Sequence, residues 1–165
     1  MTDVRTGIGW DNHRIAPGRP LILGGVRIES DIGLEGHSDA DVLSHAITDA
    51  ILGAVADGDI GTHFPDSDPQ WKGADSLRFL RHACELARGR GWEFSNVDST
   101  VILERPRLGA YRRAIRERLA TAIGIETDRV SVKFKTSEKV GSVGEGRSAE
   151  AQAIVTLVRH AENHR

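Results

Sequence analysis

The chain has 165 residues, of which 39% are apolar and 28% are charged, and its formal net charge is -2. This size and composition are typical of one globular domain, and we expect residues 1–165 to form a single domain. The balanced charge gives no indication of a nucleic-acid partner, and no apolar run approaches the roughly 20 residues that cross a membrane. A single cysteine, Cys84, and a polar start without a leader pattern indicate a cytoplasmic protein.

The first predicted elements are strands. We expect residues 7–15, GIGWDNHRI, to be extended, so that side chains two positions apart point to the same side. In residues 19–30, RPLILGGVRIES, two apolar runs flank Gly24 and Gly25. Both glycines can adopt the positive φ of a two-residue turn, which predicts a β-hairpin.

Three helices are predicted from apolar residues that recur every three or four positions. The first has Ser38 or Asp39 available as N-cap and Gly58 just past its end, and the third ends at Gly124. The three segments are residues 38–58, 73–91 and 108–124.

Three later segments are rich in β-branched residues and are predicted to be strands, although the Ala and Glu content of the last also suits a helix. They are residues 96–104, 128–136 and 149–160. The glycine-rich segment 138–146 is predicted to be a loop. Together these elements predict an α+β domain (an α/β sandwich), with a mixed sheet of about four strands and helices packed on one face.

One group of side chains has the composition of a metal site. Asp11 and His13 lie two apart in an extended segment, and His45 lies on the first helix, on the same face as Asp41 and Asp49. A carboxylate and two imidazoles are the ligand mixture of catalytic zinc sites, which leave a fourth position open. From spacing alone, His45 is better explained as a hydrogen-bonded histidine on the side of a helix than as a metal ligand. The choice between the two roles therefore depends on the other motifs.

A second candidate lies where the chain enters the first helix. His37 and Ser38 stand at this point, and a helix N-terminus offers unpaired N–H groups to an anion such as phosphate. The alternative for Ser38 is helix capping, with Asp41 completing a capping box. The two roles are compatible.

Four motifs, in this order and at these spacings, resemble the 2-C-methyl-D-erythritol 2,4-cyclodiphosphate synthase family. They are GWDNH (9–13), LILGGVRI (21–28), the long block 36–76 beginning GHSDADVLSHAITDA, and KTSEKVG (135–141). The resemblance runs from about residue 7 to the end of the chain, and its long block is very specific. It implies a metal-dependent lyase of the non-mevalonate pathway of isoprene biosynthesis.

The resemblance implies a role for each matching residue. Asp11, His13 and His45 would bind one Zn²⁺ per subunit, and His37 and Thr136 would stabilise the transition state. Glu138 would bind a second metal, Mg²⁺ or Mn²⁺, that arrives with the substrate. The residues that would contact the cytidine-diphosphate-linked substrate are Asp11, His13, His37, Ser38, Asp59, Gly61, Phe64, Pro65, Asp66, Ser67, Asp68, Leu103, Arg107, Leu108, Lys135, Thr136, Ser137 and Glu138.

Within this set, Phe64 to Asp68 match a loop that closes over the substrate, and Leu103 to Gly109 match the border of the cytidine. The resemblance also implies a homotrimer whose active sites lie between subunits, with Lys135 to Glu138 serving the zinc of a neighbour. The substrate would be a small molecule, with no nucleic acid or membrane involved.

One loop departs from the family pattern. Many members have a Phe and an Arg there, lining a cavity on the trimer axis that has been proposed to bind isoprenoid phosphates. This chain has Ser142 at the Phe position and two residues fewer, so the Arg has no counterpart and Arg147 is displaced from it. The resemblance therefore carries over the active site and not this cavity ligand.

Two other functions fit parts of the pattern. A metal-dependent phosphohydrolase could use an open zinc ion to activate water, and its product would be a linear phosphate. A non-catalytic trimer that binds a nucleotide or a metal is the third hypothesis, but the intact metal-site residues, Thr136 and Glu138 argue against it.

Overall fold

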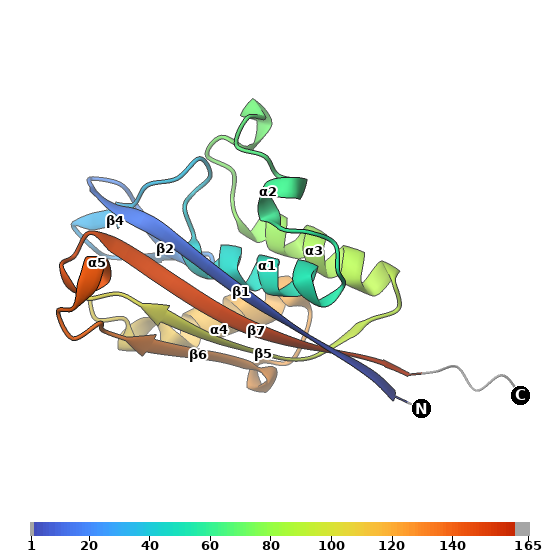
Figure 1. Ribbon diagram of the computed structural model, residues 1–165. Helices are drawn as coiled ribbons and strands as arrows, with labels where there is room; N and C mark the ends of the chain where they lie inside the picture. The colour runs from blue at the N-terminus through green and yellow to red at the C-terminus, as the bar shows by residue number, and fades with distance from the viewer. Residues whose placement is uncertain (1, 161–165) are drawn as a thin grey trace, which may run out of the picture.

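The computed structural model describes residues 2–160 and contains a five-stranded sheet with helices on it (Figure 1). The strand order is β4-β1-β7-β5-β6, in which β5 and β6 are parallel and the other neighbours are antiparallel. The strands are β1 (Thr2–Pro17), β4 (Ile32–Leu34), β5 (Glu93–Ile102), β6 (Val130–Lys135) and β7 (Ser148–His160). The predicted mixed sheet is confirmed, and segment 149–160 is a strand.

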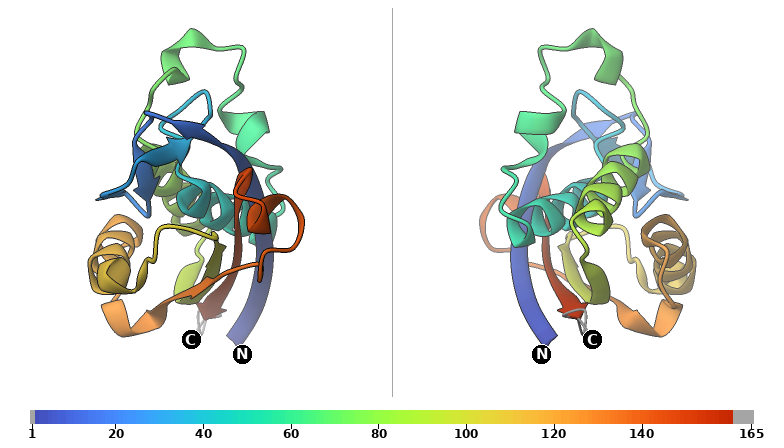
Figure 2. Two further views of the ribbon diagram at one scale, coloured as in Figure 1. Left: turned by 90° about the vertical axis from the view of Figure 1, so that its left-hand side faces the viewer. Right: turned by 90° about the vertical axis from the view of Figure 1, so that its right-hand side faces the viewer.

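Three helices cover one face of the sheet, which curls around the first of them (Figure 2). They are α1 (Val42–Ala54), α3 (Leu77–Gly89) and α4 (Arg112–Ile123). The α+β class is therefore confirmed. Apolar side chains of the helices and of alternate strand positions form the main core, in which Cys84 is buried. Burial raises the pKa of the Cys84 thiol to about 12.

The predicted hairpin is present as β2 (Leu21–Leu23) and β3 (Val26–Ile28). Gly24 and Gly25 both have positive φ, as a two-residue turn of this kind requires. The helix end at Gly124 is also confirmed, since this residue has the left-handed conformation of a C-cap.

Two local predictions were wrong. The N-cap of α1 is Asp41 and not Ser38 or Asp39, because the Asp41 carboxylate accepts hydrogen bonds from the backbone of Ser44 and of both turn glycines of the β2–β3 hairpin. The segment 138–146 is not entirely a loop, since Gly141 to Gly144 form the short helix α5 (Gly141–Gly144). The remaining short elements are α2 (Ile60–His63), η1 (Pro69–Trp71), η2 (Gly109–Tyr111) and η3 (Thr127–Arg129).

Glycines in β1 let α1 approach the sheet very closely. A Cβ atom on Gly9 would lie 1.9 Å from the carbonyl oxygen of Ala46, and one on Gly7 would lie 1.8 Å from that of Ala50. Asp11 and His13 continue this row along the same face of β1. The glycines therefore set the short separation between β1 and the helix that carries the predicted zinc ligand.

Replacing Gly9 by alanine is expected to destabilise the fold by about 3 kcal/mol, because the new methyl group meets helix backbone that has no freedom to yield. Gly53→Ala is the matched control: its Cβ would lie 3.9 Å from the nearest atom outside the helix, and alanine favours helices. Denaturant unfolding measures both variants. A Gly9→Ala protein as stable as Gly53→Ala would contradict this account of the packing.

Candidate metal centre and active site

Two elements bring the predicted zinc ligands together. β1 carries Asp11 and His13 on the face that meets α1, and His45 lies one turn into α1. The Oδ2 atom of Asp11 is 3.0 Å from Nδ1 of His13 and 3.0 Å from Nδ1 of His45. Within residues 2–160, these three form the one group of His, Cys, Asp or Glu ligand atoms close enough to share a metal ion.

The charges of Asp11 and His45 depend on each other. Burial raises the pKa of the Asp11 carboxyl, but the ring nitrogens of His13 and His45 outweigh burial and hold that pKa well below its ordinary value. Burial lowers the pKa of His45, but the Asp11 carboxylate outweighs it and raises that pKa above its ordinary value. The carboxylate is therefore ionised, and a cation is favoured beside it.

The geometry fits a divalent metal ion. Nδ1 of His13 is buried and makes no hydrogen bond within the described residues, although Oδ2 of Asp11 lies 3.0 Å away. Buried polar atoms are rarely left in this state. One carboxylate oxygen and two imidazole nitrogens are ligands that zinc prefers, and three protein ligands leave a position for substrate.

A cavity of about 370 Å³ opens over this group. Nine of the 19 predicted site residues line it. Its wall is completed by four residues that the motifs did not single out as ligands or contacts: Gly36, Ile60, Trp71 and Phe79. The predicted residues that line it are Asp11, His13, His37, Ser38, His45, Gly61, Phe64, Pro65 and Asp66.

The segment from Phe64 to Asp68 is anchored by its aromatic end. Phe64 is buried, stacks on Phe79 with ring centroids 4.4 Å apart, and meets Trp71 edge-on at 5.1 Å. Ser67 and Asp68 do not line the cavity, and the Asp68 side chain instead caps η1. Aromatic packing therefore fixes one end of the segment beside the metal ligands.

Asp59 has a local structural role in the described chain. Its carboxylate is the N-cap of α2 and accepts hydrogen bonds of 2.8 Å from both the backbone N–H and the hydroxyl of Thr62, which lower its pKa. Asp49 acts similarly from α1, since its Oδ1 accepts from the backbone of Ile60 at 2.8 Å. The two acids hold α2 at the edge of the cavity.

Five other predicted contacts line a different cavity, of about 580 Å³, which shares no lining residue with the first. The residues found there are Leu103, Arg107, Leu108, Lys135 and Thr136. Ser137 and Glu138 follow directly in sequence: the Thr136 hydroxyl donates to Glu138 Oε1 at 2.7 Å, and the Ser137 N–H donates to Glu104 at 3.1 Å. One chain therefore carries the predicted site in two separate parts.

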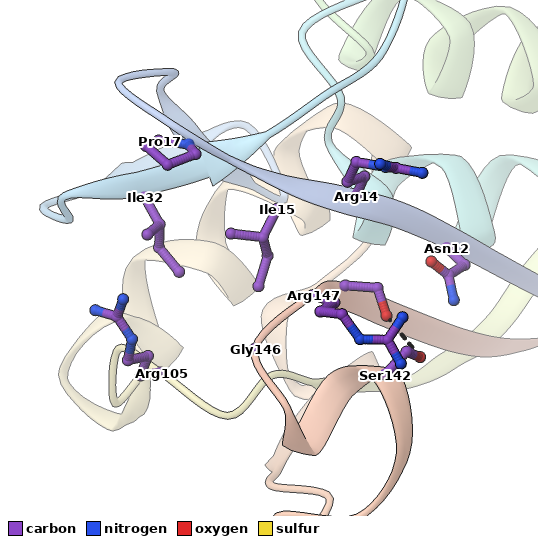
Figure 3. A pocket seen from close by; sticks show the side chains of 10 residues that line it. Asn12, Arg14, Ile15, Pro17, Ile32, Arg105, Ser142, Gly146 and Arg147 are labelled. Carbon is purple, nitrogen blue, oxygen red and sulfur yellow. Dashed lines mark hydrogen bonds between the residues drawn. The ribbon is translucent and has the colours of Figure 1, made fainter.

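A third cavity, of about 600 Å³, lies beside the loop that departs from the family pattern (Figure 3). Arg14, Arg105 and Arg147 contribute to its lining. Arg147 donates to Glu145 at 2.7 Å, and the Ser142 hydroxyl accepts from Ser148 at 2.9 Å. The displaced Arg147 therefore already has a carboxylate partner.

Comparison with known proteins identifies the family. The model of the YgbB family matches residues 4–158. The chain belongs to the YgbB family. A curated relative, the 2-C-methyl-D-erythritol 2,4-cyclodiphosphate synthase of Solibacter usitatus, is 70% identical over 157 residues, which are 95% of this chain and 99% of the relative. The resemblance and the synthase function predicted from the motifs are thus confirmed.

Solved structures of YgbB relatives have the same fold. IspF of Plasmodium falciparum in a CDP complex has a TM-score of 0.85 and 36% identity, over 96% of this chain and 97% of that one. The bifunctional IspDF of Campylobacter jejuni has a TM-score of 0.93 and 38% identity, over 97% of this chain and 43% of that one. In the described part of this chain, no helix is long and apolar enough to span a membrane.

Proposed function

We propose that this protein converts 4-diphosphocytidyl-2-C-methyl-D-erythritol 2-phosphate to 2-C-methyl-D-erythritol 2,4-cyclodiphosphate and CMP, as a metal-dependent lyase of isoprene biosynthesis. The observation that carries the proposal is the Asp11–His13–His45 group, which lies in a cavity lined by the other motif residues. The CDP complex of a relative supports a cytidine nucleotide as part of the ligand.

The substrate contains its own nucleophile. An oxygen of the 2-phosphate attacks the β-phosphorus, a new P–O–P bond forms, and the bond between the β-phosphorus and the bridging oxygen breaks, so that CMP leaves with that oxygen. A phosphate is already anionic at neutral pH, and no general base is needed. The protein must overcome repulsion between anions and the entropy of ring closure.

The residues of the site can offset both the repulsion between anions and the entropy cost of ring closure. Asp11, His13 and His45 would hold Zn²⁺, and Glu138 would hold Mg²⁺ or Mn²⁺. When bound, these ions supply Lewis-acid charge to phosphate oxygens. His37 and Thr136 would donate hydrogen bonds to charge that develops in the transition state, and Ser38 lies in the same cavity as His37.

The active form is proposed to be a homotrimer with sites between subunits. The two predicted parts of the site occupy separate cavities of one chain, and a second chain that brought its own second part to the metal ligands would complete the site. The outer face of the sheet also exposes large apolar side chains, among them Ile8 and its cross-strand partner Ile154, with Trp10 and Val4 nearby on β1. Such a face is typical of an interface between subunits.

Incubation with the cytidylylated substrate and Mg²⁺, followed by phosphorus NMR, tests the proposal. A cyclic diphosphate and an equal amount of CMP are expected. A linear phosphate product would show a metal-dependent phosphohydrolase instead, and an unchanged substrate would support a non-catalytic binding protein.

The altered loop predicts weak binding of isoprenoid diphosphates. A contact between Arg and phosphate contributes about 1.5–3 kcal/mol, and Arg147 is paired with Glu145 instead. Calorimetric titration with geranyl diphosphate is expected to show weak or no binding, while CMP release stays intact, and Arg147→Ala should change neither result. Tight binding at one ligand per trimer, lost in Arg147→Ala, would show that Arg147 replaces the missing cation.

A further inference from the structure

A buried serine holds the side of the His45 ring that faces away from Asp11. Nε2 of His45 lies 2.8 Å from Oγ of Ser76, with Ser38 Oγ as a second neighbour at 3.2 Å. Ser76 is fully buried, and its hydroxyl also bonds to Oδ1 of Asp39. A continuous series of contacts therefore joins Asp39, through Ser76, to a predicted metal ligand.

The carboxylate of Asp39 is held by three hydrogen-bond donors. It accepts the Ser76 hydroxyl, the Ser76 N–H at 3.1 Å and the Asp41 N–H at 3.2 Å. Ser76 is the N-cap residue of α3, so Asp39 also lies at the positive end of a 13-residue helix. Every one of these contacts uses the Asp39 carboxylate as an acceptor.

The chemistry of these groups fixes the direction of each hydrogen bond. The Asp39 carboxylate accepts from Ser76, so Ser76 uses its single hydroxyl proton in this bond. The Ser76 oxygen then offers only lone pairs to His45, and Nε2 of His45 must carry the proton that lies between them. The nitrogen left for a metal ion is Nδ1, which lies 3.0 Å from Asp11 Oδ2.

We propose that Asp39 and Ser76 are positioning residues, which keep the proton on Nε2 of His45 and thereby aim its Nδ1 lone pair at the metal position. This inference rests on the proposed metal site. A carboxylate behind a histidine ligand orients the ring and raises its basicity, and loss of such a partner typically costs about 10–100-fold in metal affinity.

Zinc affinity, measured by competition with a chelator, tests the inference on the full chain. Ser76→Ala removes the nearer acceptor for Nε2–H and leaves Ser38 Oγ, the second neighbour, at 3.2 Å. Asp39→Asn keeps the shape of the side chain but places an amide N–H donor beside Ser76. The Ser76 hydroxyl then no longer has to donate to residue 39, and its proton can point at Nε2 of His45, where it would disfavour a proton on that nitrogen. Each is expected to weaken zinc binding about 10–100-fold. Ser99→Ala, which removes a buried hydroxyl that donates to Ser131 O at 2.9 Å on the sheet, should leave zinc affinity unchanged.

A second measurement separates positioning from general loss of structure. In the zinc-loaded wild type with ¹⁵N-labelled histidine, NMR should show a slowly exchanging Nε2–H proton on His45, and this signal should be lost in Ser76→Ala. If Ser76→Ala does not fold, Asp39→Asn carries the same test with a side chain of equal size. Thermal unfolding of the metal-free proteins shows whether each variant is folded.

The outcomes distinguish the two proposals. Wild-type protein that binds zinc, with equal affinity in both variants, would overturn the positioning role and leave the metal site standing. Wild-type protein that binds no zinc would overturn the metal site and the positioning role together. Weaker binding in Asp39→Asn and Ser76→Ala but not in Ser99→Ala supports both.

Discussion

Replacing His45 or Asp11 by alanine is expected to reduce the zinc content from one ion per chain to almost none. Each change leaves two protein ligands, and a site with two ligands binds zinc poorly. Activity should fall by about 10³-fold or more, because Lewis-acid stabilisation of the transition state contributes several kcal/mol. Metal analysis of the purified proteins and assay of CMP release measure the two effects.

His160→Ala is the matched control for these variants. His160 is exposed at the end of β7, where Nδ1 of its ring lies 3.3 Å from the hydroxyl of Thr2. Its removal should leave zinc and activity as in the wild type. Unchanged zinc in both His45→Ala and Asp11→Ala would mean that the helix histidine and the strand carboxylate do not share an ion.

Co-refolding inactive His45→Ala chains with inactive Glu138→Ala chains is expected to restore activity. The two residues belong to different parts of the site, so a site between subunits can take an intact His45 from one chain and an intact Glu138 from its neighbour. Random assembly of equal amounts should give intact sites in about one quarter of all positions. CMP release by the mixture, compared with each variant alone, measures the recovery.

The composition of the mixed assemblies must be verified, for example by native mass spectrometry of chains with different tags. Verified mixed trimers without activity would contradict sites shared between subunits. The negative control is a chain that carries both His45→Ala and Glu138→Ala. Trimers refolded from this double variant contain no intact site.

Short-range rules predicted the elements that depend on local conformation. Gly24, Gly25 and Gly124 need positive φ wherever they lie in the fold, so a turn and a helix end could be assigned at these residues. Strand β4 was not predicted, because it has three residues and owes its extended form to pairing with the end of β1.

The N-cap of α1 could not be predicted for a similar reason. Ser38, Asp39 and Asp41 are all good N-caps, and the choice depends on contacts from distant parts of the chain. Asp41 receives the hairpin amides, while Asp39 receives the backbone and side chain of Ser76. Sequence spacing alone contains no information about these partners.

The candidate site also contains residues that the sequence pattern predicts and residues that it does not. Asp11, His13 and His45 have a recognisable spacing, which the motifs support, and the structure places them together. Ser76 and Phe79 act through contacts with His45 and Phe64, and no local pattern identifies them. The alternating Gly7 and Gly9, in the same row as Asp11 and His13, are the one signal that could have indicated a close helix–sheet contact.

The close approach of α1 to β1 also makes metal binding part of the folding equilibrium. An ion held by Asp11, His13 and His45 would join strand to helix across their contact, and unfolding would separate its ligands. A ligand bound only by the folded state adds about 4.1 kcal/mol to the free energy of unfolding when its free concentration is 1,000 times its dissociation constant. The melting temperature of this protein should therefore rise with the logarithm of free zinc, so that cellular zinc supply would set its lifetime as well as its catalytic rate.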